Sequence, residues 1–117
     1  MSYVDGFVTP VPKKKISAYK RVSNRFGRIL RELGALEFRE CIADDVKWGK
    51  RTSFPRSVKQ KPSEISWFSW IIYKSRAHRD AVNKKVMAQM QKEMPPKKMP
   101  FDFKRMAFGG FKALVEY

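Results

Sequence analysis

The chain has 117 residues with 26 Lys and Arg against 11 Asp and Glu, so its formal net charge is +15 at pH 7. Hydrophobic residues make up 43% of the sequence, which argues against disorder throughout and fits one compact domain over residues 1–117. The longest apolar stretch, residues 65–73, is far shorter than the about 20 residues that a membrane-spanning helix needs.

The cysteine content and the N-terminal residues predict a cytoplasmic location. A single cysteine excludes an internal disulfide framework and suits a reducing cytosol. Asp5 precedes the first lysines, which is the wrong order for a secretory signal.

The first part of the chain predicts a strand followed by a helix. Alternating apolar and small residues predict a strand over residues 2–11. From Lys13 onward apolar residues recur every three or four positions, which predicts a helix. Gly34 is predicted to end this helix, because glycine adopts the left-handed conformation that follows a helix end. Gly27 lies inside the helix and indicates a close approach of its backbone to the sheet.

The middle of the chain predicts further strands. Residues 35–43 are predicted as a strand and residues 44–50 as a loop. A short extra strand is predicted over residues 52–59 and a turn over residues 60–64. The strongest strand prediction covers residues 65–73, which are rich in aromatic and β-branched side chains.

A second helix and a last strand complete the pattern. Ser75 is predicted to cap the helix, and Pro95 and Pro96 are predicted to end it. The last strand is predicted over residues 105–115, with a bulge or tight bend at the glycine pair 109–110. The resulting βαββαβ order predicts a ferredoxin-like α+β fold, an antiparallel sheet with two helices on one face.

The predicted sheet is apolar on both faces, although two helices cover only one. In the 65–73 strand, one face carries Trp67 and Ile71, and the other carries Phe68 and Trp70. Soluble monomers rarely expose large apolar patches, so a second copy of the sheet is the simplest cover. A homodimer through the sheet face is therefore predicted. The alternative is that the loop over residues 44–64 folds across this face.

Four segments of the chain resemble the YbaA-like bacterial proteins, a family described as a domain of unknown function. Their sequences, in chain order, are YVDGFV, ALEFRECIADDV, FSWIIYKSRAHRDAVNKKVM and MPFDFKRMAFGGF. The resemblance implies a ferredoxin-like fold that pairs into a dimeric α/β barrel, with no established activity. Relatives of that barrel include small monooxygenases and haem-degrading enzymes, so a small monooxygenase-like enzyme is an alternative by fold analogy only.

Polar residues on one strand predict a small-molecule pocket between the sheet and the helices. Glu37, Arg39 and Cys41 share one face of the 35–43 strand, and Asp5 and Trp70 are candidate neighbours from other strands. Such groups would fix a ligand by hydrogen bonds. The alternative is a buried ion pair between Arg39 and an acid that serves packing or dimer register.

The start of the second helix carries Lys74, Arg76, His78 and Arg79. A helix N-terminus already carries partial positive charge, so cations there are unfavourable unless an anion neutralises them. This cluster predicts an anion-binding site. The alternative is a dimer contact in which Asp80 or an acid of the partner supplies the counter-charge.

Neither a metal site nor a cofactor is predicted. Cys41 and His78 are the only soft ligands, and neither has partners at zinc-site spacing. The net charge favours nucleic acid or an acidic partner as an alternative function. The segment KRMAFGGF is similar to the RNA-recognition-motif signature, but it follows the second helix, whereas that signature precedes it. No motif therefore supports nucleic-acid binding.

Overall fold

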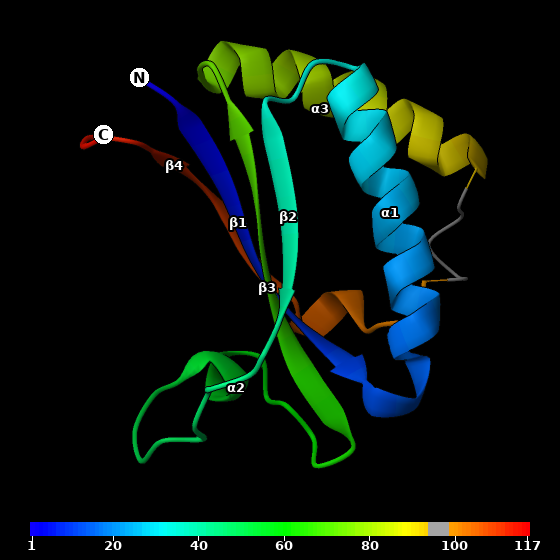
Figure 1. Ribbon diagram of the computed structural model, residues 1–117, viewed down its shortest axis with the longest axis vertical. Helices are drawn as coiled ribbons and strands as arrows, with labels where there is room; N and C mark the ends of the chain where they lie inside the picture. Colours follow the sequence, from blue (N-terminus) through cyan, green and yellow to red (C-terminus); the bar gives the residue numbers. More distant parts are fainter. Residues whose placement is uncertain (94–98) are drawn as a thin grey trace.

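The computed structural model describes residues 1–93 and 99–117, which form an antiparallel sheet with two long helices on one face (Figure 1). The strands are β1 (Tyr3–Pro12), β2 (Glu37–Ile42), β3 (Glu64–Tyr73) and β4 (Ala107–Lys112). They lie in the order β2-β3-β1-β4, and every neighbouring pair is antiparallel. The predicted βαββαβ arrangement is confirmed.

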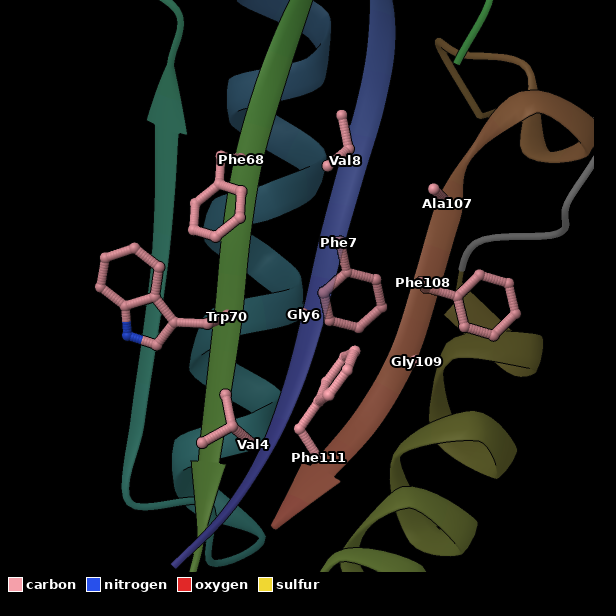
Figure 2. A pocket seen from close by; sticks show the side chains of 10 residues that line it. All are labelled: Val4, Gly6, Phe7, Val8, Phe68, Trp70, Ala107, Phe108, Gly109 and Phe111. Atoms are coloured by element: carbon pink, nitrogen blue, oxygen red, sulfur yellow. The ribbon is translucent and has the colours of Figure 1, made fainter. Parts of the chain in front are cut away.

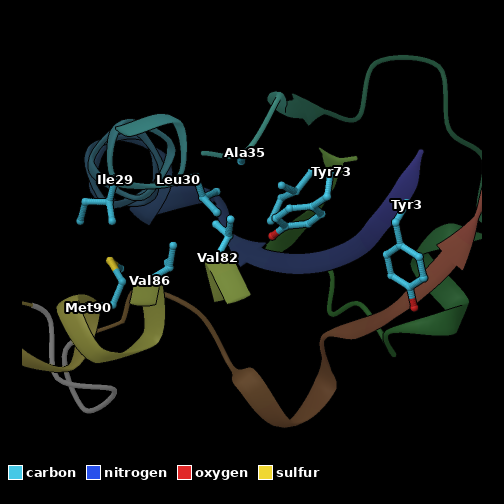
Figure 3. Packing of buried hydrophobic residues seen from close by; sticks show 9 residues of the cluster. Tyr3, Ile29, Leu30, Ala35, Tyr73, Val82, Val86 and Met90 are labelled. Carbon is cyan, nitrogen blue, oxygen red and sulfur yellow. The ribbon is translucent and has the colours of Figure 1, made fainter. Parts of the chain in front are cut away.

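The main core lies between the sheet and the helices α1 (Ile16–Glu32) and α3 (Arg76–Glu93). Ile29 and Leu30 of α1 face Val86 of α3, as Figure 3 shows. The core also contains Tyr3, Ala35, Ile71, Tyr73, Val82 and Met90. Both helices pack their apolar stripes on the same side of the sheet, and among the described residues no helix of this length lies on the opposite side.

The predicted helix ends agree with the structure where it describes them. Gly34 has a φ of 117° directly after the C-cap of α1, so its left-handed conformation ends the helix. Ser75 Oγ accepts a hydrogen bond from the His78 N–H at 3.1 Å, which caps α3. The predicted stop at Pro95 and Pro96 lies outside the described residues.

Gly27 brings α1 close to β2, as predicted. A Cβ atom placed on Gly27 would lie 2.7 Å from Cδ2 of Phe38. Phe38 packs edge-on against Phe26, with ring centroids 5.5 Å apart. Glycine at position 27 therefore makes the space in which the Phe38 ring lies under the helix.

The predicted strand over residues 52–59 is wrong, because this segment forms the short helix α2 (Phe54–Ser57). Ser53 Oγ accepts a hydrogen bond from the Arg56 N–H at 3.1 Å, and Pro55 lies in the first turn. Serine at the cap and proline in the first turn are signals for a helix start, and they outweigh the apolar residues nearby.

The predicted bulge at the glycine pair is also wrong. β1 and β4 pair in unbroken register from Tyr3 opposite Lys112 to Val8 opposite Ala107. A side chain at Gly110 would collide with the side chains of Tyr3 and Arg79. Gly110 is thus explained by a close approach of side chains and not by a kink of the strand.

The segment between β2 and β3 covers only one end of the sheet's second face. Helix α2 contacts β1 and β3 there, and Pro10, Val58 and Ser66 are buried. Phe54 packs edge-on against Phe68, with ring centroids 5.6 Å apart. The loop alternative thus applies to this end alone, where Figure 1 shows α2 apart from the two long helices.

Candidate functional site

The side of the sheet that points away from α1 and α3, here called the open face, contains a hollow of about 640 Å³. Tyr3, Ile71 and Tyr73 pack against the helices, so their neighbours in sequence point the other way. The open face consists of Val4, Gly6 and Val8 of β1, Phe68, Trp70 and Ile72 of β3, Ala107, Gly109 and Phe111 of β4, and Glu37, Arg39 and Cys41 of β2. Figure 2 shows the hollow from this side, with α1 behind the strands.

Two glycines create the hollow. Gly6 lies opposite Gly109 on one side and opposite Trp70 on the other. A Cβ atom at Gly6 would meet nothing within 4 Å, so the middle of the face has no side chains to fill it. The aromatic residues Phe68 and Phe111 rise beside it and are 43% and 65% exposed. The result is an apolar depression with aromatic walls.

A polar group borders the hollow on the β2 side. The Trp70 Nε1–H donates a hydrogen bond to Oε2 of Glu37 at 2.7 Å. Arg39 lies 3.7 Å from the other carboxylate oxygen, and its side chain is 62% exposed. In a single copy the ion pair is solvated and contributes little to stability, and the alternative of an ion pair at Arg39 that is buried on dimer formation stays a prediction. Both charged groups can meet a bound molecule.

Cys41 lies farther along the same strand, opposite Phe68. It lines a second, smaller hollow of about 240 Å³ next to Val8 and Phe54, under the loop that follows β2. The thiol is half-buried. Cys41 thus shares the open face with Glu37 but lies toward its covered end.

The predicted position of the pocket is corrected by the strand register. Four of its candidates, Glu37, Arg39, Cys41 and Trp70, lie on the open face and not between the sheet and the helices. Asp5 lies on the opposite face. Alternation along each strand separates the two faces correctly, but which face the helices cover depends on pairing between strands.

Asp5 belongs to a separate group at the start of α3. Arg79 Nε lies 3.3 Å from Oδ1 of Asp5, and Arg79 also donates to the Tyr3 hydroxyl at 3.1 Å. Burial raises the pKa of Asp5, and the Arg79 charge opposes this rise. The group holds α3 against β1.

The predicted anion-binding residues do not converge. Arg79 is engaged by Asp5, while Arg76 lies 3.7 Å from Asp80 and is largely exposed. His78 Nδ1 accepts a hydrogen bond from the Lys74 N–H at 3.0 Å, and the ring packs against Tyr73. Two of the four basic groups therefore serve the fold, and the other two point to solvent.

Glu40 is a half-buried polar residue that the sequence analysis did not single out. Its carboxylate accepts hydrogen bonds from the Tyr19 hydroxyl and from Ser23 Oγ, each at 3.0 Å. Burial between α1 and the sheet raises the pKa of Glu40. Alternation places Glu40 on the strand face opposite to Glu37, but which of the two faces the helices cover depends on pairing between strands, so no pattern within the segment marks Glu40 as covered.

Within residues 1–93 and 99–117, no three His, Cys, Asp or Glu side chains are grouped as ligands of a metal ion would be. In the same ranges, no helix is both long and apolar enough to cross a membrane.

Most of the chain matches a known protein family. Residues 2–103 match the family described as "Protein of unknown function (DUF1428)". The chain belongs to the DUF1428 family. It is 43% identical over 116 residues to the uncharacterized protein YbaA of Escherichia coli (strain K12), with 99% of each chain covered. YbaA of Shigella flexneri gives the same values, which confirms the YbaA-like resemblance.

Solved structures confirm the ferredoxin-like fold of this DUF1428 chain. An uncharacterized NIPSNAP domain protein from Burkholderia xenovorans has a TM-score of 0.59 at 17% identity, over 95% of this chain and 93% of its own. A dimeric ferredoxin-like protein from an uncultured marine organism has a TM-score of 0.50 at 14% identity, over 98% and 96%. At these identities the likeness shows the fold alone.

The segments that carry the DUF1428 resemblance also build the hollow. YVDGFV contributes Val4 and Gly6, FSWIIY contributes Phe68 and Trp70, and the glycine-rich end contributes Phe111. The family motifs thus meet on the open face, although they are far apart in sequence.

Proposed function

We propose that two copies of this DUF1428 chain pair through their open faces and hold a small molecule in the space between the sheets. The two long helices occupy the other face, so a partner sheet can approach the part of the open face that α2 leaves uncovered. Phe68 and Phe111 are partly exposed on an otherwise apolar surface, which favours burial against a second copy.

The size and shape of a single copy support pairing. Its accessible surface is 8333 Å². A compact monomer of this mass is expected to expose roughly 6,600 Å², so one copy exposes about a quarter more than usual. The excess is large enough for a standard interface, which buries about 800 Å² on each partner.

A structural neighbour gives further support. The ferredoxin-like protein from the uncultured marine organism is itself described as dimeric. A dimeric α/β barrel, in which two such sheets face each other, fits the predicted homodimer. The symmetric partner would present the same hollow, so the two hollows would form one chamber.

The site's chemistry indicates the kind of ligand. Phe68, Trp70 and Phe111 supply apolar walls, and Glu37 and Arg39 supply opposite charges at one edge. This combination suits a small, mainly apolar molecule with a polar group at one end. The apolar hollow on the open face, with this charged pair at its edge, is the observation that carries the proposal.

A thermal-shift screen with small metabolites tests the ligand part. We expect one or more compounds to raise the Tm of the wild type, because a ligand that binds only the folded state stabilises it. Gly6→Val fills the hollow and should abolish that rise, whereas Thr52→Val in the exposed loop should keep it. Unchanged melting curves across the whole panel would refute the ligand.

Two further expectations from the sequence stay predictions. The small monooxygenase-like enzyme rests on fold analogy only. The cytoplasmic location rests on the cysteine content and the N-terminal residues.

A further inference from the structure

The outer surface of α1 is basic along its whole length. Lys20, Arg21, Arg25, Arg28 and Arg31, here called the α1 basic face, are all exposed. The three lysines of η1 (Lys13–Lys15) precede them and are exposed as well. This face points away from the sheet, because the opposite stripe of α1 is buried in the core.

The charges of the α1 basic face are not neutralised within the protein. Within residues 1–93 and 99–117, none of these five side chains forms an ion pair. The only acid in α1 is Glu32, and within the described ranges it does not pair with them. By contrast, Arg79 and Arg105 are held by carboxylates. The cations of α1 are therefore free to meet an external anion.

The spacing of these cations suits a long anion. Arg21, Arg28 and Arg31 lie on the same exposed side of α1, and ten residues of α-helix span about 15 Å. Double-stranded DNA carries a negative charge about every 1.7 Å of its axis, so several phosphates fall within that length.

We propose that the α1 basic face binds the phosphate backbone of double-stranded nucleic acid, without sequence preference. A membrane surface fits less well, because helices that bind there bury an apolar stripe in lipid, and the apolar stripe of α1 packs on the sheet. Single strands are bound through stacking on aromatic residues, and every aromatic residue of α1 lies on its buried side. The inference does not depend on dimer formation or on the ligand of the open face.

A pair of matched variants tests the proposal. Arg21→Gln, Arg28→Gln and Arg31→Gln together remove three cations from the face and keep good helix formers. Lys47→Gln, Lys50→Gln and Arg51→Gln remove three exposed cations from the loop and give the same net charge. Far-UV circular dichroism and urea unfolding check that both variants fold.

Binding is measured by fluorescence anisotropy with DNA and RNA duplexes of about two helical turns, with the matching single strands, and with phosphatidylserine vesicles. We expect the α1 variant to bind duplexes at least about tenfold more weakly at about 100 mM salt, with a log–log salt slope less steep by about two to three. The loop variant should bind as the wild type does. The two duplexes show whether DNA or RNA is preferred.

Three outcomes would overturn the proposal. The first is a wild type that binds neither duplex at low salt. The second is an equal loss of affinity in the loop variant, which would show that the net charge acts from everywhere on the surface. The third is binding to single strands or vesicles that is as tight as binding to duplexes.

Discussion

Arg105 connects three parts of the chain through its guanidinium group. It donates hydrogen bonds to Glu64 at the start of β3, at 2.8 Å, and to the backbone oxygen of Lys59 at 3.0 Å. It also pairs with Asp102 in the segment before β4. Glu64 is only 4% exposed, and the Arg105 hydrogen bonds lower its pKa. The Lys61 N–H also donates to Glu64 Oε1 at 2.8 Å, but Arg105 supplies the only ion pair to Glu64 within the described residues.

Arg105→Met should lower the free energy of unfolding by about 3–5 kcal/mol, because it removes the guanidinium that pairs with the buried Glu64 carboxylate and leaves it only the Lys61 N–H. Urea unfolding followed by tryptophan fluorescence measures the loss. Arg76→Met is the control, since its ion pair with Asp80 is exposed and contributes at most about 1 kcal/mol. A loss at Arg105 no larger than the control's would contradict this account.

Glu40 should make stability depend on pH. Its pKa is raised above the ordinary 4.5, so the folded protein holds this proton more tightly than the unfolded chain does. The contribution of Glu40 to the stability of the folded protein is therefore most favourable below pH 4.5 and is lost as the pH rises through the raised pKa.

Glu40→Gln removes that titration and keeps an oxygen that accepts from Tyr19 and Ser23. The unfolding free energy of this variant, relative to that of the wild type, should increase as the pH rises from about 4.5 to neutrality. Urea titrations at several pH values measure the difference, with exposed Glu32→Gln as control. A difference that does not change with pH would show that burial leaves the Glu40 carboxyl unaffected.

At the scale of elements, the contact between α1 and β2 predicts that alanine is less stable than glycine at position 27, which is the reverse of the usual order inside a helix. Alanine is normally better than glycine inside a helix by about 1 kcal/mol. At position 27 a Cβ atom would overlap the Phe38 ring, which is itself fixed by Phe26. Gly27→Ala should therefore destabilise the protein, by about 1–3 kcal/mol as for other overpacked sites.

Asn24→Ala is the matched control on the exposed side of the same helix, and it should leave stability unchanged or slightly raise it. Thermal unfolding of both variants gives the comparison. A Gly27→Ala protein that melts above the wild type would mean that α1 can move away from β2 without cost.

The elements show what the sequence predicts and what it does not. Periodicity is sufficient for α1 and for the two faces of β3, because each pattern is contained within one segment. It fails at α2, where local capping by Ser53 outweighs the strand-like residues. Gly110 does not mark a bulge. Glycine is needed there because the side chains of Tyr3 and Arg79, which are distant in sequence, come close to its backbone.

The candidate site is predictable in part for the same reason. Alternation places Glu37, Arg39 and Cys41 together on one strand face, and the structure agrees. The hydrogen bond from Trp70 to Glu37 and the separation of Asp5 from this group depend on strand register. A single sequence does not determine that register.

At the scale of the whole molecule, one copy is flat. Its extents are 37 × 36 × 21 Å, and its radius of gyration is 14.7 Å. A compact domain of this length is expected to have a radius of gyration of about 13.4 Å. The larger radius of gyration fits a two-layer structure, in which the described residues cover only one end of the sheet's second face. Pairing of two copies would supply that layer.

Sedimentation velocity at micromolar concentration tests this pairing most directly, with two variants of β4 that change the charge equally. Phe111→Lys places an ammonium on the open face, whereas Phe108→Lys places it on the opposite face of the same strand, where the residue is 70% exposed. We predict that the wild type and Phe108→Lys sediment as dimers and that Phe111→Lys sediments as a folded monomer. A wild type that sediments as a folded monomer, or a Phe111→Lys variant that remains dimeric, would contradict pairing through the open face.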